Sequence, residues 1–207
     1  MLDYLLNAFS GSGYSFMWAI TAVMAFALAV LIEKSFLFLV KWKTPSQEIL
    51  SLIQSKDFAQ ASALAGPIAG PVLENGQQED SPEMAWEAMG AAAIQAEAQV
   101  RKRIPLLATA GNVATMLGLL GTVYGLTVAF SSLGEAGQSA TDQLSQGISM
   151  AMATTAFGLC VAIPCVAAHA WLEARADTLL LQTESLAAEL HLAKKRLLRS
   201  NNEAAQQ

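Results

Sequence analysis

The chain has 207 residues, of which 54% are hydrophobic and only 14% are charged; a soluble domain would carry about 25% charged residues, so the composition indicates a membrane protein. The formal net charge of −5 argues against a nucleic-acid partner, because nucleic-acid binding requires a basic face. The two cysteines, Cys160 and Cys165, lie five positions apart in an apolar run and would not share one face of a helix, so no disulfide is expected.

The chain begins with a short leader, residues 1–13, that contains Asp3 and no basic residue. A secretory signal would begin with positive charge, so cleavage is not expected and a non-cytoplasmic N-terminal segment is predicted. The first apolar stretch covers residues 14–40 and is interpreted as transmembrane helix 1. Glu33 and Lys34 fall near its end and are expected at the depth of the lipid headgroups.

Residues 41–103 are predicted to form a loop that contains helices. One helix is expected over Ser46–Leu64, and the two Gly-Pro pairs of AGPIAGPV are expected to break it before the polar loop ENGQQEDSPE. The sequence SPE at residues 81–83 predicts the start of an Ala-rich helix. This helix is expected to lead into the next span through Pro105, because a proline at a membrane boundary kinks or resets a helix.

Residues 104–131, IPLLATAGNVATMLGLLGTVYGLTVAFS, carry no charge and are predicted to be transmembrane helix 2. At about 1.5 Å per residue the helix would be about 40 Å long, enough to cross a hydrocarbon core of about 30 Å. A seam of small residues recurs along it at alternating spacings of four and three: Gly111, Thr115, Gly118, Thr122, Gly125 and Ala129. Such a seam lets a second helix approach closely within lipid.

A short polar loop, residues 132–142, separates this span from the third uncharged stretch, residues 143–172, which is predicted to be transmembrane helix 3. Pro164 would free a backbone carbonyl within this helix. Residues 173–207 are expected to form a C-terminal helix and tail. A second small-residue seam follows the same spacing in the third span: Ala151, Thr155, Gly158, Ala162 and Cys165.

All twelve Lys and Arg residues lie in the first inter-span loop, at its edges, or in the C-terminal tail, and none lies in the leader or the second loop. The positive-inside rule therefore places the N-terminus outside and the first loop and C-terminus in the cytoplasm; with the resemblance described below, the outer side is the periplasm. The predicted fold class is an all-α integral membrane protein, with three transmembrane helices that extend into a cytoplasmic helical region.

Each seam carries a threonine near the middle of its span, Thr122 in the second and Thr155 in the third. Two interpretations remain open at this point: ordinary helix packing with each hydroxyl bonded back to its own helix, or hydroxyls that line a polar path. Neither span contains Asp, Glu, Lys or Arg. A titrating carboxylate, the usual mark of a proton relay, would therefore have to come from another subunit.

An enzyme is not expected from this sequence. No set of His, Cys and Asp has metal-ligand spacing, and no loop is typical of phosphate binding, so neither a metal nor a cofactor is predicted. Ser149 and His169 lie twenty positions apart on one predicted helix, which would separate them by roughly 30 Å.

Two segments resemble the MotA/TolQ/ExbB proton-channel family, and its ExbB and TolQ branch most of all. They are IPLLATAGNVATMLGLLGTVYGL and GISMAMATTAFGLCVAIPCVAAH, and the pair GLLGTVYG and TTAFGL…AIP is specific in combination. LIEKSFLFL at the end of the first span is similar to the branch signature Ile-Glu-Arg-x-x-x-Leu, with Lys34 in place of arginine. The resemblance covers most of the chain, from Phe16 to about Leu172.

The resemblance implies a three-span subunit that assembles as a homopentamer in the bacterial inner membrane. The pentamer would surround two single-span partners of the ExbD/TolR kind, whose helix carries the essential Asp, and a TonB/TolA-like protein would be a further partner. Ion flow past that Asp would rotate the pentamer and the partner dimer against each other and deliver work to the periplasm. The resemblance places the pore threonines on Thr122 and Thr155 and the signature glutamate on Glu33.

The chain departs from the family pattern at several positions. Met150 stands where members often have a glutamate that is assigned to ion handling near the periplasmic mouth, and Thr115 replaces a common proline. The doubled threonine Thr154-Thr155 resembles sodium-driven flagellar stators, and with Thr115, Thr122 and a partner carboxylate it would offer the several oxygen ligands that sodium prefers. Alternatively, Thr154 lies about 100° around the helix from Thr155 and packs against a neighbour. Protons are the default ion and sodium is the alternative.

The powered process is open between TonB-dependent uptake, Tol-type envelope maintenance and another motor of the same kind. A non-conducting membrane scaffold that only holds partner helices is a second class of function, and it would tolerate the loss of the threonine hydroxyls. A small-solute transporter is not expected, because three spans without an internal repeat are unlike the repeated architecture of transporters.

Overall fold

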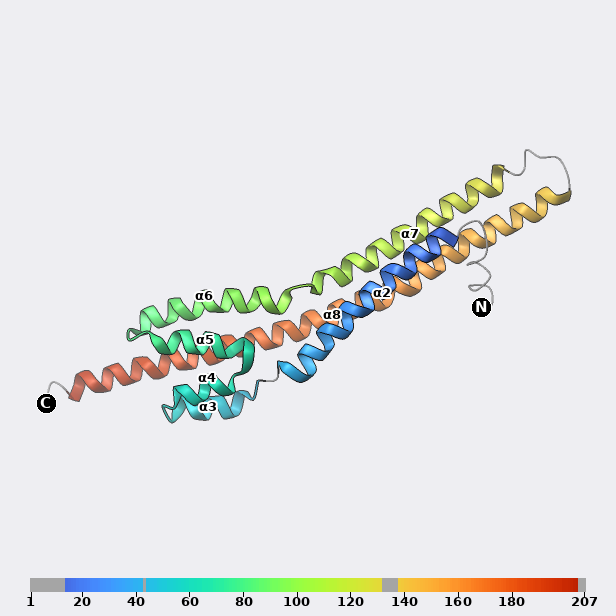
Figure 1. The fold of residues 1–207 in the computed structure, drawn as a ribbon. Helices are drawn as coiled ribbons and strands as arrows, with labels where there is room; N and C mark the ends of the chain where they lie inside the picture. Colours follow the sequence, from blue (N-terminus) through green and yellow to red (C-terminus); the bar gives the residue numbers. More distant parts are fainter. Residues whose placement is uncertain (1–13, 43, 132–137, 205–207) are drawn as a thin grey trace. The chain divides into compact units, whose positions relative to one another are not determined.

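The computed structural model describes residues 14–42, 44–131 and 138–204. Within these ranges every regular element is a helix, in agreement with the predicted all-α class (Figure 1). The leader and most of the predicted second loop lie outside the described residues. The chain divides into two compact units: Met1–Glu33 with Arg103–Trp171, and Lys34–Lys102 with Leu172–Gln207.

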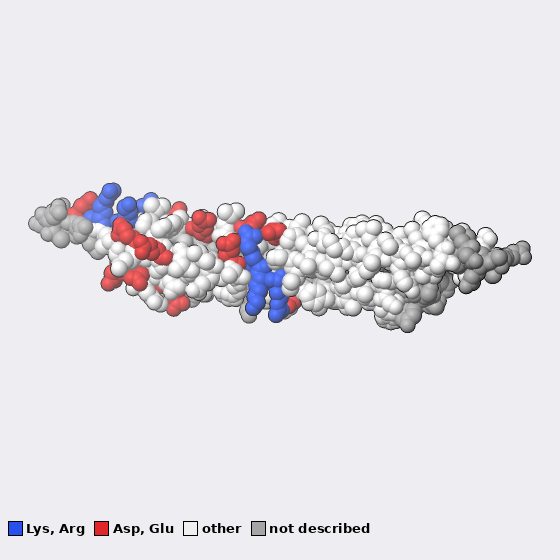
Figure 2. Space-filling view, turned by 90° about the horizontal axis from the view of Figure 1, so that it is seen from above, with Lys and Arg blue, Asp and Glu red and all other residues white. Residues whose placement is uncertain are grey.

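The first unit is built from α2 (Tyr14–Phe36), α7 (Ile104–Ser131) and the N-terminal half of α8 (Gln138–Ala204), which lie side by side in Figure 1. A short π-helical turn, η1 (Leu37–Lys41), follows α2. Three stretches, within Ser15–Val40, Pro82–Ser131 and Thr141–Ser200, are long and apolar enough to cross a membrane. Figure 2 shows a broad surface without charged side chains, as expected for such helices.

The bounds of α8 differ from those expected for the third span. The helix begins at Gln138, so residues 138–142 are helical rather than part of a loop, and it continues past residue 172 to Ala204 without a break. Both extensions have the same cause: residues 138–146 and residues 165–204 contain no glycine or proline that could stop a helix. By contrast, α7 has the same bounds as the predicted second span.

The second unit contains α3 (Ser46–Gln54), α4 (Phe58–Leu64), α5 (Gly66–Gln78), α6 (Pro82–Arg101) and the C-terminal half of α8. Apolar residues from these helices form its core, with exposed fractions of 2% or less: Ile49, Ile53, Ile68, Val72, Leu73, Met89, Leu186 and Leu190. Ser81 caps α6 by accepting a hydrogen bond from the Met84 amide, so this helix starts at the predicted SPE motif.

A helix ends at Leu64, as expected from the Gly-Pro pairs, but the helix expected over Ser46–Leu64 is divided into α3 and α4. The expectation that a break and a polar loop follow is wrong, because the segment GPIAGPVLENGQQ forms α5. Gly66 adopts a positive φ of 76°, which glycine tolerates, and Pro67 then occupies the first turn, where its missing amide proton has no partner to lose. Pro71 lies only one turn further on. Gly70 brings α5 against α4, since a Cβ there would lie 2.9 Å from the Ser62 carbonyl oxygen.

Two lysines stabilise helix ends in this unit. Lys194 of α8 donates hydrogen bonds to carbonyls at the C-terminal end of α5, those of Gly76, Gln77 and Glu79. Burial lowers the pKa of Lys194, and the nearby carboxylates of Asp80 and Glu79 oppose that change. Lys34, only 3% exposed, donates to the Val100 carbonyl in the last turn of α6 and lies 5.1 Å from the centre of the Trp42 ring. Cations at these positions complement the negative end of a helix dipole.

Candidate functional site

The candidate site lies where α7 and α8 cross within the first unit, and glycines bring the two backbones into direct contact there. A Cβ on Gly118 would lie 3.1 Å from the Thr154 carbonyl oxygen and 3.3 Å from the Gly158 Cα. A Cβ on Gly158 would lie 2.7 Å from the Ala114 carbonyl oxygen. Nothing larger than glycine fits at these points without moving a helix.

The contact continues on both sides of this point. Gly111 faces Ala162 and Cys165, and Gly125 faces Ala151 and Gly147, each within 3.4 Å of where its Cβ would lie. The predicted seam positions Gly111, Gly118, Gly125, Ala151, Gly158 and Ala162 are all buried. The α7–α8 contact therefore uses these six residues.

The buried face of α7 contains the glycines and Ala129 of the predicted seam, but Ala114 and Gly121 take the place of the two threonines. Ala114 and Gly121 are fully buried, whereas Thr115 and Thr122 lie at the edge of the contact and are half-buried. The spacing of Ala114, Gly118, Gly121 and Gly125 follows the same four-three pattern, so α7 carries two adjacent stripes of small residues. The spacing of Ala114 and Gly121 is the sequence signal for their burial, and it is as regular as the spacing of Thr115 and Thr122.

The edge of the contact brings Thr122 and Thr155 together. Their Oγ1 atoms contact each other directly across the two helices. The Thr122 hydroxyl also lies 3.2 Å from the Gly118 carbonyl of its own helix and 3.2 Å from the Ala151 carbonyl of α8, and the Thr155 hydroxyl lies 3.2 Å from the Gly118 carbonyl. Four oxygen atoms from two helices thus form one cluster, which we call the threonine cluster.

The threonine cluster has more acceptors than protons. Each hydroxyl has one proton and two lone pairs, and each carbonyl keeps a second lone pair beyond its helical hydrogen bond. The Thr122 and Thr155 protons, with a third that Thr154 donates to the Ala151 carbonyl, serve four oxygen atoms, so the Thr122 and Thr155 hydroxyls can exchange partners. Such a group can accept from a protonated acid, hydrate a proton or supply oxygen ligands to a small cation. It holds no group that titrates near neutral pH.

The hydroxyls of the other two predicted pathway threonines do not contact those of Thr122 and Thr155. Thr154 is fully buried, donates to the Ala151 carbonyl at 2.9 Å and fills the space above Gly121, so it packs between the helices. Thr115 donates to the Gly111 carbonyl of its own helix at 3.0 Å. The structure therefore brings together two of the four threonines, and the roles of all four in ion passage stay predictions.

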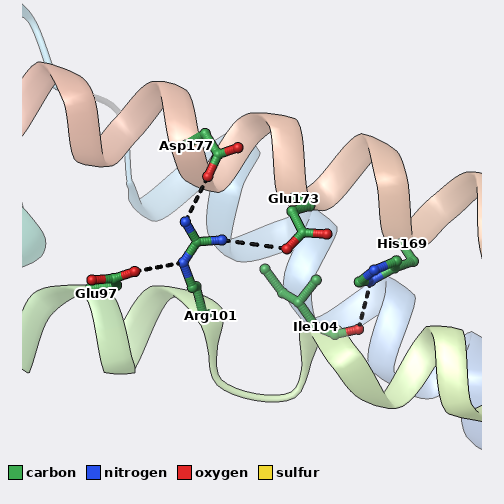
Figure 3. A network of polar contacts seen from close by, with 6 residues as sticks. All are labelled: Glu97, Arg101, Ile104, His169, Glu173 and Asp177. Carbon is green, nitrogen blue, oxygen red and sulfur yellow. Dashed lines mark hydrogen bonds and ion pairs between the residues drawn. The ribbon is translucent and has the colours of Figure 1, made fainter.

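The three predicted boundary residues have different local roles. Glu33 at the end of α2 accepts two contacts from the Arg103 guanidinium, at 2.7 and 2.8 Å. Pro105 occupies the first turn of α7, where a proline costs no hydrogen bond. The exposed Pro164 lies inside α8, which continues through it, and its nitrogen cannot donate to the Cys160 carbonyl. His169 lies 3.2 Å from the Ile104 carbonyl (Figure 3).

Sequence reasoning missed an ion-pair cluster in the second unit, centred on Arg101 at the end of α6. Figure 3 shows its guanidinium among three carboxylates: Glu97 at 2.9 Å, Asp177 at 2.7 Å and Glu173 at 3.4 Å. The hydrogen bonds to Glu97 and then Asp177 raise the pKa of Arg101 above its ordinary value. The basic run at residues 101–103 was the available signal, but two of the three partners, Glu173 and Asp177, lie more than 70 positions away.

Comparison with known proteins gives one family. The model of the MotA/TolQ/ExbB proton channel family matches residues 52–185, more than half of the chain. A biopolymer transport protein ExbB of Xanthomonas campestris is 31% identical over 147 residues, which cover 71% of this chain and 58% of that relative. ExbB of Aquifex aeolicus is 36% identical over 95 residues, 46% of this chain and 64% of the relative.

A Tol-Pal system protein TolQ of Haemophilus influenzae is 39% identical over 80 residues, 39% of this chain and 35% of that relative. The chain therefore spans between about a third and two thirds of the length of these relatives. Both the family model and the named relatives agree with the resemblance that the motifs of α7 and α8 indicate. The chain belongs to the MotA/TolQ/ExbB proton channel family, within its ExbB/TolQ branch.

Proposed function

We propose that this chain is the ion-channel and stator subunit of an energy-transducing motor in the bacterial inner membrane. The motor would couple proton flow to mechanical work on the periplasm or outer membrane, such as TonB-dependent uptake. Members of the family are channel or motor subunits rather than enzymes, and the three apolar helices make this chain a multi-pass membrane protein.

The threonine cluster is the observation that carries the proposal. The hydroxyls of Thr122 and Thr155 meet the carbonyl oxygens of Gly118 and Ala151 at one point between two apolar helices. These helices contain no Asp, Glu, Lys or Arg across residues 104–131 and 143–172. A proton crossing here needs a carboxylate to carry it, and this chain offers only neutral oxygens. The cluster is therefore half of a site that a partner carboxyl group completes.

The partner in this proposal is an ExbD/TolR-like single-span dimer that supplies the essential Asp. Five copies of this chain would surround it, the N-terminus would be periplasmic and the C-terminus cytoplasmic. The named relatives support the class of motor, and the distribution of Lys and Arg supports the orientation. A TonB/TolA-like protein would receive the work. The protonated Asp would donate to the acceptor-rich cluster, and the ionised Asp would accept from hydroxyls that turn away from the carbonyls.

Replacing Thr155 with valine tests the proposal, since valine keeps the shape and removes the hydroxyl. We expect Thr155→Val to abolish the powered process while insertion and oligomer size are unchanged. Thr127→Val is the matched control, because the exposed Thr127 hydroxyl only bonds back to the Val123 carbonyl. A strain that lacks the native subunit would be complemented with each variant and scored for outer-membrane uptake and for detergent resistance.

The same assays separate the alternatives. Full activity of Thr155→Val would overturn the ion-channel proposal and leave the non-conducting scaffold. Rescue of detergent resistance without rescue of uptake would assign a Tol-type motor. The oxygen cluster itself favours sodium as the second candidate ion, because several neutral oxygens and a carboxylate suit that cation. Activity that is unchanged when sodium is removed at constant proton-motive force would exclude sodium.

A further inference from the structure

A groove runs between α6 and the C-terminal half of α8 in the second unit. Its volume is about 480 Å³, and three large apolar side chains on its lining are unusually exposed: Trp86 at 46%, Leu181 at 66% and Ile94 at 70%. All three lie outside the spans predicted from the sequence, so lipid does not account for their exposure. Exposed apolar side chains of this size that gather along one groove mark an interaction surface.

The middle of the groove is open to a partner. The α6 side of the groove is one ridge of five residues at spacings of four, three, four and four: Trp86, Gly90, Ala93, Glu97 and Arg101. The two central residues are small, and a Cβ added to Gly90 would meet nothing within 4 Å. The ridge spans about 22 Å, long enough for four turns of a second helix to lie along it.

The rim of the groove is acidic. Glu97, Asp177 and Glu184 line it, against Arg101 as the one cation on the lining. Arg101 is already engaged with Glu97 and Asp177, and also with Glu173. Glu184 is exposed, and among residues 14–42, 44–131 and 138–204 it forms no hydrogen bond or ion pair. The rim therefore offers negative charge to a partner.

We propose that this groove binds the basic amphipathic helix that flanks a membrane span of a partner protein on its cytoplasmic side. An apolar floor with a charged rim fits helix-in-groove recognition, in which an amphipathic helix lays its apolar face into a groove. Cytoplasmic flanks of membrane spans are rich in Lys and Arg, which complement this rim. Arg101 lies three residues before Ile104, so its Cα is within about 11 Å of the start of the span.

This inference rests on the proposed function, because that function supplies the cytoplasmic orientation.

A second copy of the chain fits the groove less well. Its own basic run, residues 194–199, begins 10 positions beyond Glu184, the nearest rim carboxylate, about 15 Å further along α8, and Lys194 is already bonded to α5. Copies related by a rotation axis along the membrane normal meet at equal depths, so this run would lie beyond the acidic rim of a neighbour's groove.

A pair of synthetic peptides tests the proposal. The probe is a 14-residue helix with Leu at i, i+3, i+4 and i+7 and with Lys on its remaining positions, and the matched control carries Glu in place of Lys. Fluorescence anisotropy would measure their binding to the full chain in nanodiscs of zwitterionic lipid, with the binding to empty nanodiscs subtracted. We expect the Lys peptide to bind at least about tenfold more tightly than the Glu peptide, and added salt to weaken it.

Three variants locate the binding. Gly90→Leu fills the open part of the groove on an exposed helix face, and we expect it to weaken binding at least about tenfold. Glu184→Lys reverses one exposed rim charge and is expected to weaken binding about two- to tenfold. Glu74→Lys is the control, because Glu74 is equally exposed but lies on α5, away from the groove, and it should leave binding unchanged.

Each outcome of these binding experiments either supports or overturns the groove assignment. Equal binding of the two peptides, or binding that Gly90→Leu leaves intact, overturns the proposal. A change in the oligomer size of the chain itself on Gly90→Leu would assign the groove to a second copy, which also overturns it. The result is separable from the proposed function, since Thr155→Val should retain peptide binding. If Thr155→Val is fully active and the peptide still binds as expected, the ion-channel proposal fails and the groove assignment stands.

Discussion

Arg103 combines a strained backbone with an ion pair to Glu33. Its φ of 71° places a non-glycine residue in the left-handed region, which costs roughly 1–2 kcal/mol. The ion pair with Glu33 joins side chains that are 49% and 44% exposed, and an exposed pair returns about 0–1 kcal/mol. The strain exceeds what the contact returns, so the guanidinium orients Glu33 rather than adding net stability.

Two variants separate the strain from the charge. Arg103→Gly removes both, and we expect the free energy of unfolding to rise by up to about 1 kcal/mol. Arg103→Gln keeps the strained backbone and loses the ion pair, so the free energy of unfolding should fall by about 0–1 kcal/mol. Both would be measured by denaturant titration in detergent micelles. If both variants lower it equally, the backbone of Arg103 is not strained.

The sequence predicts the positions of Thr122 and Thr155 but not the backbone conformation of Arg103. The spacing of small residues on two uncharged spans placed Thr122 and Thr155 on facing seams, and the structure puts their hydroxyls in contact. The strain at Arg103 could not be predicted, because arginine has no local preference for a positive φ and Glu33 lies 70 positions away. Periodic patterns along one helix are readable, whereas contacts fixed by distant segments are not.

Among the helices, α5 and α8 show which element boundaries a sequence can give. Gly66 and Pro67 mark the end of α4, as the sequence predicts, and they also start α5, because a Gly-Pro pair is compatible with both a turn and a first helical turn. In α8, Pro164 does not end the helix. The long uncharged spans were recognisable from length and composition alone, and the short helices of the second unit depended on packing that no local pattern encodes.

The glycines of the α7–α8 contact give a prediction with an internal control. Gly158→Ala would place a Cβ 2.7 Å from the Ala114 carbonyl oxygen, so the helices must separate, and we expect the free energy of unfolding to fall by about 1–3 kcal/mol. Gly90→Ala makes the same change on α6, where a Cβ meets nothing, and should raise it by about 0.5–1 kcal/mol. Denaturant titration of both in detergent checks the pair. Equal effects would show that helix propensity, rather than close approach, controls Gly158.

For the molecule as a whole, charge is separated along the sequence. All twelve Lys and Arg residues lie outside residues 104–131 and 143–172, and none lies between these two spans. Each predicted crossing therefore has a basic flank on one side only, which is the pattern that sets orientation in a membrane. This asymmetry predicts the side on which every extramembrane segment lies, and it does so independently of any role of the threonine cluster.

Cysteine labelling tests this orientation on the intact chain. In a Cys160→Ala, Cys165→Ala background, Asp142→Cys at the start of α8 should react with a membrane-impermeant maleimide added to cells whose outer membrane is permeabilised. Glu48→Cys on α3 should react only after the inner membrane is opened or inverted. Both positions are exposed, so a difference in labelling reports the side of the membrane rather than burial. Labelling of both from the same side would mean that α7, the predicted span between the two positions, does not cross, and the threonine cluster would then have no transmembrane path to serve.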